Sequence, residues 1–124
     1  MLSAIVKAVK RLQGKTMDRM LKQGMILIDT EQGRDTLIIR PNGVFSCLLQ
    51  SCDRVQRSLQ LPVSTAETIL DHLESLQDEE GNVWQVLLIY RDGRTVRVCG
   101  PDVGTVMTKE LRTFLETEGI HLSY

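Results

Sequence analysis

The sequence has few of the side chains from which catalytic and metal sites are built. Its 124 residues include three cysteines and two histidines, and no glycine-rich phosphate-binding motif occurs in it. Cys47 and Cys52 would lie on opposite faces of a continuous strand, about 17 Å apart, which is too far to share a metal ion. We therefore predict no metal, cofactor or catalytic site and no small-molecule substrate, and we expect the protein not to be an enzyme.

The remaining candidates for acid–base chemistry are His72, His121 and the carboxylates of residues 63–82. His72 lies just off the apolar stripe of an acidic segment, where a histidine is typically solvated. A helix surface spreads its carboxylates in water, whereas acid–base catalysis requires a cleft that shifts their pKa values. We expect these carboxylates to form a solvated acidic face.

Long hydrophobic runs are also missing. The longest aliphatic run, residues 86–89, is far shorter than the roughly 18 to 20 apolar residues that cross a bilayer, so we predict no membrane span. At the N-terminus an apolar stretch precedes Lys7, the reverse of the order in a secretory signal. The three cysteines are an odd and sparse set, unlike the disulfide framework of a small secreted domain. We therefore expect free thiols and a cytoplasmic location.

Aromatic residues make up only 4% of the chain, too few for a platform that stacks single-stranded bases. The formal net charge of −1 gives the whole protein no strong attraction to nucleic acid. The charges are nevertheless segregated, because residues 1–25 contain six cations and one acid, whereas residues 63–82 contain six acids and no lysine or arginine. Each segment can therefore attract an oppositely charged partner, or the two can attract each other.

What the sequence does contain is the pattern of a single α+β domain spanning all 124 residues, with an apolar fraction of 42% that suffices for one core. Asn42-Gly43 and Asp92-Gly93 each lie between two apolar runs, the strongest short-range signal for a tight hairpin. Residues 25–29 and 55–61 predict further strands, and residues 120–124 predict a short terminal one. Together these segments predict an antiparallel sheet of about five or six strands.

A basic amphipathic helix is predicted for residues 2–23. Gly14 permits a break within it, since glycine costs about 1 kcal/mol relative to alanine, and Gly24 is placed to end it. The apolar residues recur at spacings of three and four: Leu2, Ile5, Val6, Val9, Leu12, Met17, Met20 and Leu21. Residues 1–24 are therefore expected to pack on the sheet or on a partner.

Two further helices are predicted after the first hairpin. One begins at Ser64, whose side chain forms a capping box with Glu67, and stops before Gly81. The other spans residues 105–118 and carries an apolar face. We expect both helices to cover the sheet.

A two-residue loop at each glycine dipeptide predicts which side chains share a face of the sheet. In the second hairpin it places on one face Leu87, Ile89, Val96 and Val98, and on the other Trp84, Val86, Leu88, Tyr90 and Cys99. In the first hairpin it places on one face Leu37, Ile39, Val44 and Leu48, and on the other Ile38, Phe45, Cys47 and Leu49. A sheet with one wet face alternates cleanly between apolar and polar residues, and neither hairpin does. We therefore expect the two later helices on one face and the N-terminal helix, a second subunit or a partner on the other.

The order helix, strands, helix, hairpin, helix resembles the layout of class I type III secretion chaperones, which implies a small dimeric protein that wraps a secreted effector. Residues 84–115, with Tyr90-x-Asp92-Gly93 followed by Leu111-x-x-Phe114-Leu115, resemble the C-terminal half of emfourin-type protease inhibitors. The first resemblance is one of element order and the second rests on turn and stripe residues. Neither assigns a role to any residue.

The absence of a catalytic constellation, the two-sided apolar hairpins and the segregated charge predict a non-enzymatic protein-binding module, such as an inhibitor, an immunity protein or a chaperone-like adaptor. The partner is another protein or a second copy of the chain. The alternative is a nucleic-acid-associated regulator that binds through the basic N-terminal helix. The residues expected to contact a partner are Lys7, Lys10, Arg11, Lys15, Arg19, Lys22, Trp84, Tyr90 and Arg97.

Overall fold

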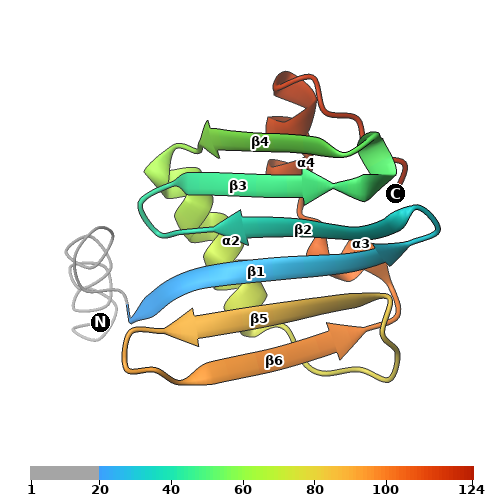
Figure 1. Ribbon diagram of the computed structural model, residues 1–124. Helices are drawn as coiled ribbons and strands as arrows, with labels where there is room; N and C mark the ends of the chain where they lie inside the picture. The colour runs from blue at the N-terminus through green and yellow to red at the C-terminus, as the bar shows by residue number, and fades with distance from the viewer. Residues whose placement is uncertain (1–19) are drawn as a thin grey trace.

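The computed structural model describes residues 20–124, which form a six-stranded antiparallel sheet with helices on one face (Figure 1). The strands are β1 (Leu21–Thr30), β2 (Gly33–Ile39), β3 (Val44–Leu49), β4 (Val55–Gln60), β5 (Trp84–Tyr90) and β6 (Thr95–Gly100), and a 3-10 turn, η1 (Gln50–Cys52), joins β3 to β4. Their order across the sheet is β4-β3-β2-β1-β5-β6, so β1 is central and β4 and β6 are the edges. The predicted α+β class and antiparallel sheet are confirmed.

Both hairpins form where the glycine dipeptides predict them, but their loops have three residues rather than two. In the first, the Gly43 N–H donates to the Arg40 carbonyl at 2.9 Å and the Arg40 N–H donates to the Val44 carbonyl at 3.0 Å. Tyr90, Gly93 and Arg94 repeat this pattern in the second hairpin. Gly43 and Gly93 have φ angles of 89° and 88°, as the left-handed position after a type I turn requires.

The extra loop residue corrects the predicted faces. Ile39 pairs with Phe45, and Leu88 pairs with Val96, whereas a two-residue loop predicts different partners. Because side chains alternate with a period of two, a shift of one residue moves a whole strand to the opposite face. Leu37, Ile39, Phe45, Cys47 and Leu49 therefore share one face, and Ile38, Val44 and Leu48 lie on the other.

The helices α2 (Val63–Ser75), α3 (Val103–Val106) and α4 (Lys109–Thr117) lie behind the sheet in Figure 1. The predicted capping box is wrong, because α2 begins after Pro62 with no side-chain cap. The predicted helix 105–118 is broken in two, and the Thr108 hydroxyl caps the second part by accepting the Leu111 N–H at 3.1 Å. Residues 120–124 pack without forming the predicted strand.

The start of β1 corrects a further prediction. Leu21 pairs with Tyr90 and Gln23 pairs with Ile89, so residues 21–23 are strand rather than the end of a helix. Gly24 does not end a helix but lies inside β1, where an added Cβ would be 2.9 Å from Leu70 Cδ2. The missing side chain therefore lets α2 approach the central strand closely. Met20 is a bend rather than helix, and residues 2–19 of the predicted helix lie outside the described residues.

The hydrophobic core lies between the sheet and the helices. Its largest fully buried side chains include Trp84 and Phe45, together with Leu70 and Leu73 of α2. The Phe114 ring of α4 meets the Phe45 ring edge to face, with 5.8 Å between ring centroids. Within residues 20–124 no helix is long and apolar enough to cross a membrane.

Candidate functional site

The face of the sheet opposite the helices, here called the open face, is covered by no element of residues 20–124. The register of the strands shows which side chains lie next to one another on this face, because directly paired residues of antiparallel strands point to the same side. One row runs across five strands in the order Ser46, Ile38, Met25, Leu87 and Arg97. The open face therefore carries three apolar side chains in a row at its centre, over β2, β1 and β5.

The neighbouring rows extend this apolar region. Leu27 and Ile89 lie beside the central row, on β1 and β5. We call Met25, Leu27, Ile38, Leu87 and Ile89 the apolar band, and each is partly exposed. Val44 and Leu48 are 37% and 38% exposed on β3. A one-sided antiparallel sheet normally places polar residues at such positions, so folding against the helices does not explain this band.

The open face is also hollowed. A depression of about 190 Å³ lies over β2, β3 and β4, with Ile38 and Leu48 among its lining residues. The other residues on its open-face side are Thr36, Ser46, Gln56 and Ser58. An apolar floor with hydroxyl and amide groups around it is typical of the centre and rim of a protein interface.

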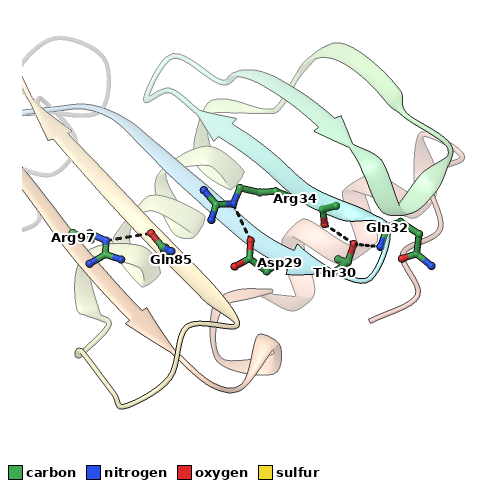
Figure 2. Close-up of polar contacts among 7 residues, drawn as sticks. Asp29, Thr30, Gln32, Arg34, Gln85 and Arg97 are labelled. Atoms are coloured by element: carbon green, nitrogen blue, oxygen red, sulfur yellow. Dashed lines mark hydrogen bonds and ion pairs between the residues drawn. The ribbon is translucent and has the colours of Figure 1, made fainter.

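Polar pairs form the rim of the open face (Figure 2). The Arg34 guanidinium contacts the Asp29 carboxylate at 2.8 Å across β1 and β2, which raises the pKa of Arg34 above its ordinary value. The Arg97 Nε–H donates to Gln85 Oε1 at 3.2 Å across β5 and β6. These contacts position the charged groups around the apolar band and satisfy part of their hydrogen bonding in the described chain.

The structure separates the residues predicted to contact a partner. Arg97 lies on the open face, and Lys22 is exposed at the beginning of β1. Tyr90 is partly buried on the helix side, where its hydroxyl donates to Glu74 at 3.0 Å and Arg94 lies over its ring. Trp84 is fully buried in the core and offers no surface to a partner. Lys7, Lys10, Arg11, Lys15 and Arg19 lie outside the described residues.

The sequence interpretation missed Met25, Leu27 and Ile38 as members of a surface. The signal was present, because residues 25–28 and 37–39 are apolar without alternation. Such runs indicate a strand that is apolar on both faces. Only the register decides which members of the run face the helices.

A second cluster is built around Asp35, a carboxylate that is 0% exposed on the helix-covered face. Its Oδ1 accepts the Ser51 N–H at 2.9 Å, and its Oδ2 accepts both the Ser51 hydroxyl and, at 2.7 Å, the Tyr124 hydroxyl. Burial, and then the bond to Asp35, raise the pKa of Tyr124 far above its ordinary value. The phenol therefore stays protonated, and the cluster ties Tyr124 to β2 and η1.

The thiols and His72 have structural partners as well. The Cys99 thiol donates to Asp78 Oδ1 at 3.2 Å, which raises the pKa of Cys99, and burial raises the pKa of Cys47. His72 Nε2 lies 2.7 Å from the Thr105 carbonyl, an atom that only accepts, so this nitrogen carries the proton. No group of three metal-ligating side chains occurs among residues 20–124.

A groove of about 430 Å³ lies between the beginnings of α2 and α4. The residues that line it are Pro62, Thr65, Lys109, Glu110, Thr113 and Phe114. Its two charged lining residues, Lys109 and Glu110, are exposed. The open face carries the apolar band over three adjacent strands, and we take it as the candidate site.

Comparison of the sequence with protein-family models and with curated proteins finds no match.

Proposed function

We propose that the protein is a non-enzymatic protein-binding module whose partner docks on the open face. The observation that carries this proposal is the apolar band, five partly exposed side chains on three adjacent central strands. Apolar clusters rimmed by polar groups are characteristic of protein interaction sites. Inhibitors, immunity proteins and chaperone-like adaptors all work by such docking, without chemistry of their own.

The chemistry of the described residues supports a binding role. Among residues 20–124, the carboxylate of Asp35 is 0% exposed, and Ser51 and Tyr124 engage it in holding the fold. The pKa values of the Cys47 and Cys99 thiols are raised, which makes them poor nucleophiles at neutral pH. All three cysteines are free, as expected for a protein of a reducing compartment, and we propose a cytoplasmic location.

A nucleic-acid partner receives no added support from the geometry. Its motivation is the cationic segment 1–19, which lies outside the described residues. On the open face Arg34 is engaged with Asp29, and the apolar band contains no aromatic side chain. A surface of this kind gains binding energy by burying apolar area rather than by stacking bases.

The test is a differential capture experiment with full-length tagged protein in extracts of the cells that produce it. Leu87→Lys places a charge in the centre of the apolar band, and Thr113→Lys places the same charge on the exposed surface of α4. We expect Leu87→Lys to abolish capture of a specific protein and Thr113→Lys to leave it unchanged. Equal capture by both variants, at matched thermal stability, would show that the open face is not the binding surface.

A further inference from the structure

The charged side chains of the open face are mostly arginines. By register and alternation, four charged residues lie in its rows: Asp29 of β1, Arg34 of β2, Arg40 directly after β2, and Arg97 of β6. Residues 20–124 as a whole have the opposite balance, with ten lysines and arginines against fifteen acids. The face that carries the apolar band is therefore cationic on a part of the chain that is acidic overall.

The three arginines surround the apolar band. Arg34 and Arg40 are about 20 Å apart along β2 at 3.3 Å per residue, and Ile38 lies between them. Arg97 lies beside Leu87 at the opposite side of the band, about 14 Å from β2 because three strand spacings separate them. Figure 2 shows Arg34 and Arg97 on the same face of the sheet. The open face thus has an apolar centre and a cationic rim.

Two of these arginines have charge to offer a partner. Neither Arg40 nor Arg97 forms an ion pair with a carboxylate of residues 20–124. Arg97 uses its Nε–H on Gln85 Oε1, and its guanidinium has further N–H groups that can donate. The Asp78 carboxylate, on the loop beside β6, accepts the N–H and the thiol of Cys99. An acid brought by a partner would therefore find donors on this rim.

An occupant that matches the open face supplies both apolar side chains and carboxylates. A nucleic-acid backbone supplies phosphates for the arginines but no apolar surface for the band. Two copies that met through their open faces would bring like charges together, which costs free energy. The α2 helix of a second copy is acidic, but it has no apolar side chain to offer, because its exposed residues are Ser64, Thr68, Glu74 and Ser75.

We infer that the partner of the open face is a protein segment that combines apolar side chains with an excess of aspartate and glutamate. Its apolar side chains lie on the apolar band, and its carboxylates bind Arg40 and Arg97. This inference rests on the proposed function, because it names the chemistry of the partner that docks there. A planar guanidinium can bind a carboxylate through two parallel hydrogen bonds, so the apolar contacts give affinity and the arginines give specificity.

The test is a selection of peptides from a random display library on immobilised full-length protein. Peptides that also bind the Leu87→Lys variant are discarded, which leaves those that require the apolar band. We expect the remaining peptides to combine aliphatic side chains with more aspartate and glutamate than lysine and arginine. Selected peptides without this acidic excess, or a library that yields no Leu87-dependent peptide, would overturn the inference.

Charge reversal provides the matched comparison. Arg40→Glu/Arg97→Glu should weaken the binding of a selected peptide by about tenfold and reduce its dependence on salt, because ion pairs at a rim are screened. The control Arg54→Glu/Lys109→Glu makes the same change of charge at exposed positions before β4 and on α4. It should leave the affinity unchanged. Equal weakening by both variants, at matched thermal stability, would contradict the role of the two arginines.

Duplex DNA and vesicles of anionic lipid are the competing anionic partners. If either binds the full chain and loses that binding in Arg40→Glu/Arg97→Glu, the arginines serve phosphate groups and the inference is wrong. The capture experiment separates the inference from the docking proposal. Capture that Leu87→Lys abolishes but Arg40→Glu/Arg97→Glu leaves intact would retain the docking surface and refute its acidic partner.

Discussion

The two faces of the sheet are built from the same strands but differ in how their apolar side chains are satisfied. On the helix-covered face, Ile26, Leu37, Val86 and their neighbours are completely buried against α2 and α4. On the open face, the five residues of the apolar band alternate with them and remain partly exposed. The strands therefore carry more apolar side chains than the helices cover. The uncovered ones lie together on the open face, where we propose that a partner docks.

The largest contrast is expected between Leu87 and Leu88, adjacent leucines of β5 that face opposite sides. Leu88 is 2% exposed, and Leu88→Ala should destabilise the protein by about 2 to 5 kcal/mol because it leaves a cavity. Leu87→Ala should cost less than half as much, since its side chain is partly in water. Chemical denaturation measures the free energy of unfolding of both variants. An equal loss of stability in the two would contradict the difference in burial between the faces.

Polar groups extend the same comparison, because a buried group that loses its hydrogen-bond partner costs more free energy than an exposed one. Tyr124→Phe removes one donor from the buried Asp35 carboxylate and should destabilise the protein by about 1 to 3 kcal/mol. Tyr90→Phe is the matched control, since the Tyr90 hydroxyl bonds to Glu74 at an exposed position and its loss should cost less. A greater loss from Tyr90→Phe in denaturation would contradict this order.

The Tyr124 cluster also predicts an alkaline dependence of stability. The pKa of Tyr124 is raised in the folded state from an ordinary value of 10.0, so its contribution is fully present below about pH 10. Above that pH the unfolded chain loses the phenolic proton while the folded chain keeps it, and the free energy of unfolding falls. The slope of this fall should be smaller in Tyr124→Phe than in the wild-type protein.

The smallest effect concerns the thiols, one on each face. Cys99 belongs to the open-face side of edge strand β6, and its bond to Asp78 raises its pKa. Asp78→Asn keeps an acceptor for the Cys99 N–H but removes the charge, so alkylation of Cys99 should become faster at pH 8. Alkylation of Cys47, buried on the covered face, should not change. Mass spectrometry of the labelled peptides reports both rates, and an unchanged Cys99 rate would refute the assignment.

The sequence predicts the class of fold well, because its strongest signals are local. Asn42-Gly43 and Asp92-Gly93 place both hairpins correctly, and the helix predicted between them forms as α2, with Ile69, Leu70 and Leu73 buried. The faces are predicted wrongly, because one extra loop residue at Gly43 or Gly93 inverts a strand. Turn composition alone does not distinguish a two-residue loop from a three-residue loop.

Other features depend on contacts between distant parts of the chain. Residues 21–23 have a spacing compatible with a helix, and pairing with Ile89 and Tyr90 makes them strand. The burial of Asp35 depends on Ser51, 16 residues away, and on Tyr124, 89 residues away. No local pattern signals such a carboxylate. The apolar runs that form the candidate site are visible in the sequence. Which of their residues lie together on the open face follows only from the register of the strands.

The most direct test of the open face as a docking surface is site-specific photo-crosslinking in the cells that produce the protein. A photoreactive phenylalanine at position 87 lies in the apolar band, and the same group at position 113 lies on the helix side. The account predicts a covalent adduct with one specific protein from position 87 and none from position 113. An adduct from position 113 alone, or equal adducts from both positions, would contradict it.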